Sequence, residues 1–250
     1  MIVLICEKCG GHDFVEENGV FVCQSCGAKH IPEDTKKTTD QTETSKKLSN
    51  LYERARKSIE VNDLTHAAEY YKQILDEDPS NWEAYFYTYL GEFTSFTNAQ
   101  APNVARKLGN TLPSACDMAV ADCDDEEALK RLDIISKHLS NRLVGIADGA
   151  AALLHQHENY FIFSAAGKVH NDLYRKLRPL VVETICACSD TFSAIDNKLL
   201  TIFKERNLTS KPEYNSILLY LRASWYNMIN KKFAPTSDVK EYLISAEYIV

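Results

Sequence analysis

The chain has 250 residues, which is enough for one large domain or two modest ones. Hydrophobic residues make up 45% of it, whereas glycine and proline number only 9 and 7, a balance typical of a helical protein rather than a turn-rich β protein. The formal net charge of −7 opposes binding to a phosphate backbone unless one face concentrates basic residues.

The eight cysteines divide into two groups. Four of them form two close pairs near the start of the sequence, and the other four are scattered through apolar helical patterns. The short segment before Cys6 is too brief for a secretory signal peptide, and no apolar run reaches membrane-spanning length. We therefore expect a cytoplasmic protein without a membrane segment, in which paired cysteines indicate a metal site rather than disulfides.

Residues 1–31 carry the most specific motif of the chain. Both cysteine pairs read Cys-x-x-Cys-Gly, a spacing that lets two thiolates of one turn reach the same ion, while the glycine permits the backbone to fold around it. Asn18-Gly19 separates two β-rich runs, which is a strong hairpin signal. The hairpin would bring the second pair back to the first.

The ligand types and their count predict one structural Zn²⁺ ion held by Cys6, Cys9, Cys23 and Cys26. About thirty residues cannot build a sufficient core, so the metal would hold this unit together. Iron in a four-thiolate site is the main alternative metal. His12 and His30 are candidate substitute ligands, but four cysteines already complete a tetrahedral shell, so we interpret both as surface residues.

A four-thiolate site leaves no open position for water or substrate, which argues against catalysis at this metal. The ribbon also carries more acidic than basic side chains, and four thiolates with zinc add further negative charge, so it would repel phosphate. Residues 1–31 resemble the short N-terminal zinc ribbons of transcription factors and of many bacterial proteins of otherwise unrelated function. The resemblance implies metal binding and specifies little biology.

Residues 32–47 contain no aliphatic or aromatic residue apart from Pro32, so we expect a solvated, flexible linker there. From residue 48 the apolar spacing becomes helical, with a break at Asn62-Asp63 and an end at Asp78-Pro79. A further helix begins at Trp82.

Residues 48–93 resemble a tetratricopeptide repeat followed by the start of another. The matching positions of this helix–turn–helix unit are Leu51, Ala55, Ala67, Tyr71 and Pro79. Ser58 and Ile74 depart from the family pattern, and no second full repeat carries the motif. The family implies binding of a peptide or protein, although a groove generally takes several repeats. Ribbon, linker and repeat together also resemble a loose class of uncharacterised bacterial proteins.

Residues 103–250 show no strand alternation and predict an α-helical domain that continues the same core. An acidic run from Asp122 to Glu127 precedes an apolar series with the spacing of one helix face, from Leu129 to Leu153. Calcium binding is the alternative interpretation of the acidic run, but the glycine and closing Glu of a calcium loop are missing. Further helices are expected over about 160–190, 192–206, 212–230 and 236–249, the first kinked or divided at Pro179.

Candidate catalytic groups are few. The chain has no nucleophile elbow, no phosphate-binding glycine loop and no dinucleotide fingerprint. His155 and His157 are two residues apart on a helix, as are Cys186 and Cys188, so the members of each pair do not face one ion. We interpret the two thiols as buried. A meeting of His138, His170 and Asp172 in space is left open by the sequence. We interpret the basic segment at 175–178 as a solvated helix face rather than a phosphate site. Tyr87 is a candidate for a partner surface.

The sequence thus predicts a mostly α protein with a small β zinc ribbon at its N-terminus. The hypothesis it favours is a zinc-binding, non-enzymatic adaptor that mediates protein–protein interaction, with an unidentified protein partner. The first alternative is a nucleic-acid-associated regulatory protein that uses the ribbon and the basic segment. The second is an enzyme whose site is assembled from separated helices. The partner, the process and the oligomeric state are not specified.

Overall fold

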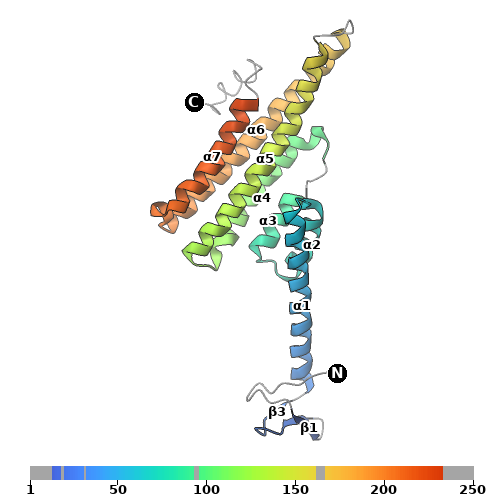
Figure 1. Ribbon diagram of the computed structural model, residues 1–250, viewed down its shortest axis with the longest axis vertical. Helices are drawn as coiled ribbons and strands as arrows, with labels where there is room; N and C mark the ends of the chain where they lie inside the picture. Colours follow the sequence, from blue (N-terminus) through green and yellow to red (C-terminus); the bar gives the residue numbers. More distant parts are fainter. Residues whose placement is uncertain (1–12, 18–19, 31, 93–95, 162–166, 233–250) are drawn as a thin grey trace. The chain divides into compact units, whose positions relative to one another are not determined.

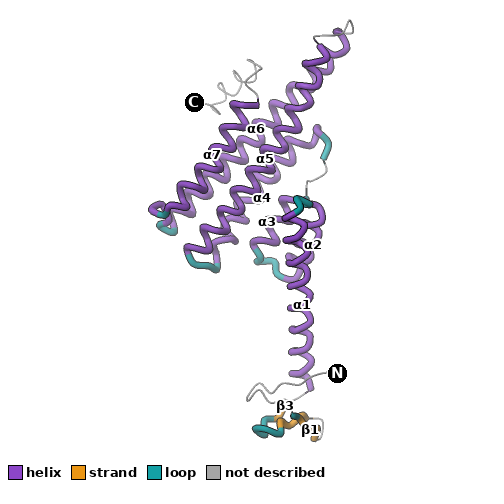
Figure 2. Tube along the Cα trace, in the orientation of Figure 1, coloured by secondary structure: helices purple, strands orange, loops and turns teal. Residues whose placement is uncertain are grey.

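The computed structural model describes residues 13–17, 20–30, 32–92, 96–161 and 167–232. It divides into two compact units, Met1–Arg54 and Ala55–Val250, and the boundary falls inside a helix. Helices dominate the described residues, and strands occur there only in the first unit, as the composition predicts (Figures 1 and 2).

The first unit contains a three-stranded antiparallel sheet in the order β1-β2-β3. Its strands are β1 (Phe14–Glu17), β2 (Val20–Cys23) and β3 (Lys29–His30). Glu17 pairs with Val20 and Phe14 with Cys23, so a two-residue connection joins β1 to β2, as the Asn-Gly signal predicts. Residues 18–19 themselves lie outside the described part of the chain.

Helix α1 (Pro32–Glu60) follows the sheet in the sequence. Residues 32–47, for which the sequence analysis expects a flexible linker, are helical, and that expectation is corrected. A lack of apolar residues removes any reason to bury this stretch, but it does not prevent helix formation. Pro32 suits the first helical position, and acids stand four residues before lysines twice along the segment.

The second unit continues with α2 (Leu64–Glu77) and α3 (Trp82–Gly91). The expected break at residues 62–63 is confirmed, because Asn62 adopts a left-handed φ of 59° and Asp63 caps α2 by accepting a hydrogen bond from the His66 amide. Gly91 packs directly on α2, where a Cβ atom would meet the Leu64 carbonyl oxygen at 2.4 Å. Only glycine permits this approach of α3 to α2.

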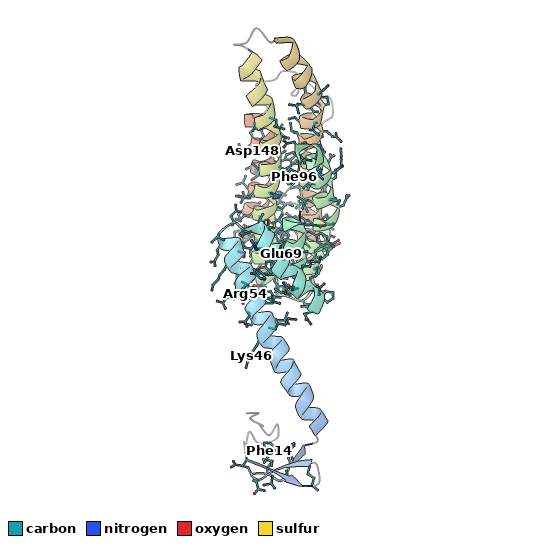
Figure 3. The ribbon with its side chains drawn as sticks, turned by 90° about the vertical axis from the view of Figure 1, so that its right-hand side faces the viewer. Phe14, Lys46, Arg54, Glu69, Phe96 and Asp148 are labelled. Carbon is teal, nitrogen blue, oxygen red and sulfur yellow. The ribbon has the colours of Figure 1, made fainter. Side chains whose placement is uncertain are left out.

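Four long helices form the rest of this unit and run side by side (Figures 1 and 2). They are α4 (Ala101–Ala121), α5 (Asp125–Phe161), α6 (Gly167–Glu205) and α7 (Pro212–Lys232), with the short helices η1 (Asn98–Gln100) and η2 (Leu208–Ser210) before α4 and α7. Helix α6 packs against α4, α5 and α7, and α3 packs against α4. Side chains fill the space between the helices (Figure 3).

The predicted apolar face of α5 is confirmed: Leu132, Ile135, Leu139 and Leu143 are fully buried, and the acidic residues lie in its first turn. One boundary is wrong, because the helices expected over 160–190 and 192–206 are a single helix, α6, which Pro179 does not divide. At the expected boundary, Thr191 is buried and donates to the carbonyl oxygens of Ala187 and Ala105, so its hydroxyl is satisfied while the helix continues. The helix expected over 236–249 lies outside the described residues.

Candidate functional site

The second cysteine pair occupies a tight turn between β2 and β3. The Cys23 amide donates to the Ala28 carbonyl oxygen at 2.9 Å, and the Gly27 amide donates to the Cys23 carbonyl oxygen at 2.8 Å. Gly27 has a φ of 71°, a conformation that residues with a Cβ rarely adopt. The backbone therefore wraps around Cys23 and Cys26 in the way that the Cys-x-x-Cys-Gly motif predicts.

The thiols of this turn differ in exposure, since Cys23 is buried in the ribbon and Cys26 is exposed. Cys6, Cys9 and His12 lie outside the described residues, as does the His30 side chain. The part of the chain that the structure describes brings together no group of three or more metal-ligating side chains. The two described ligands, Cys23 and Cys26, nevertheless fit a zinc or iron ion, because one turn carries two soft thiol donors.

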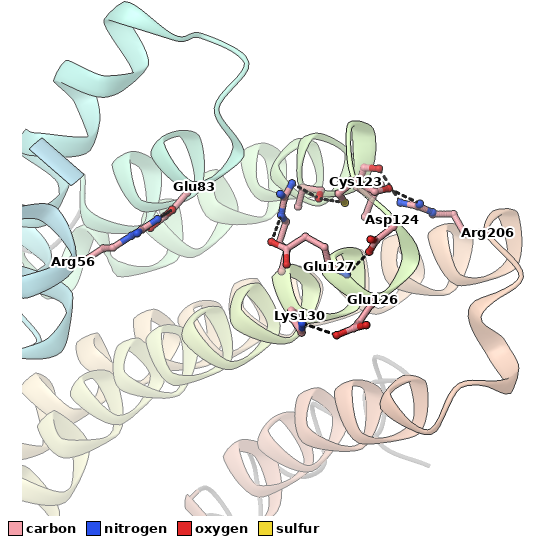
Figure 4. A network of polar contacts seen from close by, with 11 residues as sticks. Arg56, Glu83, Cys123, Asp124, Glu126, Glu127, Lys130 and Arg206 are labelled. Atoms are coloured by element: carbon pink, nitrogen blue, oxygen red, sulfur yellow. Dashed lines mark hydrogen bonds and ion pairs between the residues drawn. The ribbon is translucent and has the colours of Figure 1, made fainter. Parts of the chain in front are cut away.

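A second cluster joins the repeat-like helices α1, α2 and α3. Glu83 on α3 accepts two hydrogen bonds from the Arg56 guanidinium, at 3.1 and 2.8 Å (Figure 4). It accepts a third from the Tyr71 hydroxyl at 2.6 Å. Burial and the bond to Glu83 raise the pKa of the Tyr71 phenol, and the bond to Glu83 raises that of Arg56. Both groups therefore stay protonated at neutral pH, and their hydrogen bonds to Glu83 hold the three helices together.

The cluster continues through two stacked tyrosines to α5. The rings of Tyr71 and Tyr87 stack with centroids 4.9 Å apart, and the Tyr87 hydroxyl lies 3.3 Å from Nδ1 of His138. Tyr87 is buried, so its predicted role on a partner surface is wrong; it packs between α2 and α5 instead. Burial lowers the pKa of His138, which therefore favours the neutral form. The side chains of His170 and Asp172 lie outside the described part, and their meeting with His138 stays a hypothesis.

The scattered cysteines behave as packing residues. Cys188 is buried and directs its thiol to the Leu143 carbonyl oxygen at 3.7 Å, as expected for a buried thiol, whereas Cys186 is only half-buried. Burial raises the pKa of both thiols, and raises that of Cys116 to about 12. A thiol with a raised pKa is a poor nucleophile at neutral pH, which argues against a reactive role.

In the basic segment at 175–178, the structure describes two basic side chains: Lys176 is exposed and Arg178 is half-buried. A groove of about 480 Å³ between α5 and α7 has a mixed lining. Its acids and lysines on α5 pair with one another: Glu126 with Lys130 at 2.7 Å and Asp133 with Lys137 at 2.6 Å. These matched charges give the groove no preference for an anion or a cation.

Two arginines that the sequence analysis did not single out cap the C-terminus of α4. Arg206 donates to the carbonyl oxygens of Val120 and Cys123, at 2.8 Å each, and Arg131 donates to that of Ala119 at 3.2 Å (Figure 4). The last carbonyl groups of a helix have no partner inside it, and cations there also match its dipole. No local signal reveals these contacts, because Arg206 lies far along the chain from α4.

Comparison with protein-family models, with curated proteins and with solved structures finds no match for this chain. Among the described residues, no helix is both long and apolar enough to cross a membrane. The class of protein must therefore be argued from the ribbon turn and the helical unit.

Proposed function

We propose that the protein is a zinc-binding, non-enzymatic adaptor whose N-terminal ribbon docks on another protein. The observation that carries this proposal is the turn at Cys23–Ala28, where two thiols, a left-handed Gly27 and two backbone hydrogen bonds meet in the arrangement that a zinc knuckle needs. Cys6, Cys9, Cys23 and Cys26 would complete a closed tetrahedral site for one Zn²⁺ ion.

The role of the metal in this proposal is structural. Zinc would supply folding free energy to a unit too small to hold itself together, while this chain's residues supply the hairpin and the turn. A closed set of four thiolates offers no position for substrate, which supports an adaptor over an enzyme. The raised pKa values of Cys116 and Cys188 support the same choice, because they leave these buried thiols protonated.

The helical unit supports a tetratricopeptide-like scaffold. Ala55 and Ala67 are fully buried where the repeat pattern requires small residues, and Tyr71 is buried and stacked on α3. Tyr85 and Tyr89 lie next to each other on α3, half-exposed, with ring centroids 4.7 Å apart. Partly exposed tyrosines combine an apolar ring with a hydrogen-bonding hydroxyl, a combination that suits a protein partner.

An affinity pull-down with mass spectrometry tests this proposal. The full chain is compared with Cys23→Ser/Cys26→Ser and with Cys123→Ser/Cys186→Ser, a control that changes two half-buried thiols outside the ribbon. The proposal predicts a protein partner that both the native chain and the control recover and that the ribbon variant loses. A partner kept by all three, or recovery of nucleic acid alone, would contradict docking through the ribbon.

A further inference from the structure

The six described cysteines differ in how far solvent reaches their thiols. Cys26, in the turn between β2 and β3, is exposed. The four outside the ribbon are buried or half-buried; they are Cys116, Cys123, Cys186 and Cys188. Burial raises the pKa of the thiols of Cys186 and Cys188, and raises that of Cys116 to about 12. Among the described thiols, that of Cys26 is therefore the most accessible to a small polar reagent in solution.

Cys23 belongs to the same turn as Cys26 but is fully buried, with 0% of its surface exposed. Its carbonyl oxygen accepts a hydrogen bond from the Gly27 amide at 2.8 Å. The amide of the next residue, Gln24, donates to the Asp13 carbonyl oxygen, also at 2.8 Å. These backbone bonds fix the position of Cys23, so the turn combines one fixed, shielded thiol with one that solvent reaches.

The two thiols of the turn are close enough to bond to each other. The hydrogen bond from the Gly27 amide to the Cys23 carbonyl oxygen closes a five-residue turn. Residues three apart in a tight turn have Cα atoms within about 7 Å of each other. A disulfide spans Cα separations of about 4.4–6.8 Å, so Cys23 and Cys26 can form one without rearrangement of the strands.

We propose that Cys26 is a site of reversible oxidation by hydroperoxides, and that the disulfide it then forms with Cys23 releases the metal from the ribbon. This inference rests on the zinc site of the proposed function. When bound, zinc holds its cysteine ligands as thiolates, the form of cysteine that peroxides oxidise. Exposure selects Cys26 for the first step, and the fixed position of Cys23 provides the second thiol.

The proposed oxidation transfers two electrons from the two cysteines to one hydroperoxide. The Cys26 thiolate attacks one peroxide oxygen and the O–O bond breaks, which gives a sulfenic acid on Cys26 and, from hydrogen peroxide, one hydroxide ion. The Cys23 thiolate then attacks the Cys26 sulfur, forms the S–S bond and displaces a second hydroxide ion. Two of the four thiolate ligands are consumed, so the closed tetrahedral site no longer exists.

Titration of the zinc-loaded full chain with hydrogen peroxide tests this proposal. Cleavage after Glu17 and Glu33 gives the peptide 18–33, which contains Cys23 and Cys26 and no other cysteine. A peptide two hydrogen masses lighter therefore identifies their disulfide. We expect release of about one zinc ion per disulfide, measured with a colorimetric chelator. Dimedone added during the reaction should trap the sulfenic acid on Cys26 and not on Cys23.

The matched control is Cys123→Ser/Cys186→Ser, which removes two half-buried thiols outside the ribbon. It should form the same disulfide and release zinc at the native rate. Zinc release at least about tenfold slower than in the native chain would overturn the proposal, because the oxidised thiols would then lie in the helical unit. Dithiothreitol with one equivalent of Zn²⁺ should restore the reduced, zinc-loaded chain, and a loss that this treatment leaves in place would contradict reversibility.

The zinc content before oxidation separates this inference from the proposed function. A chain that contains zinc but forms no disulfide between Cys23 and Cys26, or that releases zinc without forming it, would overturn the inference and leave the zinc site intact. Sulfenic acid trapped first on Cys6, Cys9 or Cys23 would also overturn it. A chain purified without zinc would instead overturn the zinc site of the proposed function, and the metal release with it.

Discussion

Gly109 lies where α4 packs closely against Thr191 of α6. A Cβ atom at this position would lie 2.7 Å from Oγ1 of Thr191. That hydroxyl is fixed by its hydrogen bonds to Ala105 and Ala187, so it cannot turn aside without losing them. We expect Gly109→Ala to destabilise the fold by about 1–2 kcal/mol in chemical denaturation, although alanine favours a helix over glycine by about 1 kcal/mol.

Gly145 provides the matched control on α5. A Cβ atom there would meet nothing within 4 Å, so Gly145→Ala should raise the free energy of unfolding by about 0.5–1 kcal/mol. The two substitutions are chemically identical and differ only in their surroundings. If both stabilised the protein, the close contact between Gly109 and Thr191 would be contradicted.

Tyr71 contributes a hydrogen bond as well as a buried ring. Its hydroxyl donates to the Glu83 carboxylate at 2.6 Å, and hydrogen bonds to charged groups are worth about 1.5–3 kcal/mol. Tyr71→Phe keeps the ring and removes the donor, so the free energy of unfolding should fall by about that amount. Tyr70→Phe, a half-buried neighbour on the same helix, should change it by less than about 0.5 kcal/mol. An equal loss of stability in Tyr71→Phe and Tyr70→Phe would contradict a stabilising role for the hydrogen bond to Glu83.

His138 should contribute to the pH dependence of stability. Burial lowers its pKa in the folded state, so as the pH falls the unfolded chain takes up the proton first. The stabilisation is complete above the ordinary histidine pKa of about 6.5 and is lost as the pH falls from there through the lower folded value. Denaturation curves at pH 7 and pH 5 should differ less for His138→Gln than for the native chain. If His138→Gln showed the same difference in stability between pH 7 and pH 5 as the native chain, His138 would not be its source.

At the scale of elements, the end of α4 depends on the side chain of Arg206, the residue that directly follows α6. Arg206 satisfies two carbonyl groups there and also pairs with Asp125 at 3.1 Å. Arg206→Met keeps the length of the side chain and removes these bonds, so we expect a loss of about 2–3 kcal/mol in the free energy of unfolding. Lys204→Met, at an exposed position in the last turn of α6, should cost less than about 0.5 kcal/mol. Similar costs would show that the cap is unimportant.

Helix and strand boundaries could be predicted where polar groups find their hydrogen-bond partners nearby in the sequence, and not where the partners are distant. The hairpin at β1 and β2 and the helix break at Asn62 follow from local turn chemistry, which the sequence carries directly. The continuity of α6 through Thr191 could not be predicted, because a tertiary contact with α4 satisfies that residue. Helix α1 was missed over 32–47 for another reason: apolar periodicity, the signal used to detect helices, is absent from a solvated stretch.

In the candidate site, too, local spacing predicts some residues, and others follow only from tertiary contacts. Spacing alone selected Cys23 and Cys26, and the turn around them has the predicted backbone geometry. The contact of Glu83 with Arg56 and Tyr71 was missed, because it joins three helices and no spacing within the sequence encodes it. The burial of Tyr87, which the sequence analysis assigns to a partner surface, has a similar reason. The helix buries aromatic side chains on more than one face, against α2 and α5.

At the scale of the whole molecule, the ribbon and the helical unit differ in what would stabilise them. The helical unit has a core of fully buried leucines, isoleucines and phenylalanines, whereas the ribbon has a three-stranded sheet with short strands. The metal would therefore matter to the ribbon and leave the helices in place. We expect a strong chelator to leave the far-UV circular dichroism signal of the helices nearly unchanged while the hydrogen exchange of residues 20–30 accelerates. Loss of the helical signal would contradict this separation.

The zinc content of the purified full chain, measured by inductively coupled plasma mass spectrometry without added metal, tests the ribbon site itself. We expect about one zinc ion per chain. We expect less than about one tenth of that in Cys23→Ser/Cys26→Ser, and an unchanged content in Cys123→Ser/Cys186→Ser. A native chain without zinc, or equal zinc in both variants, would contradict the proposed ribbon site. Iron in its place would keep the four cysteines as ligands but contradict the metal.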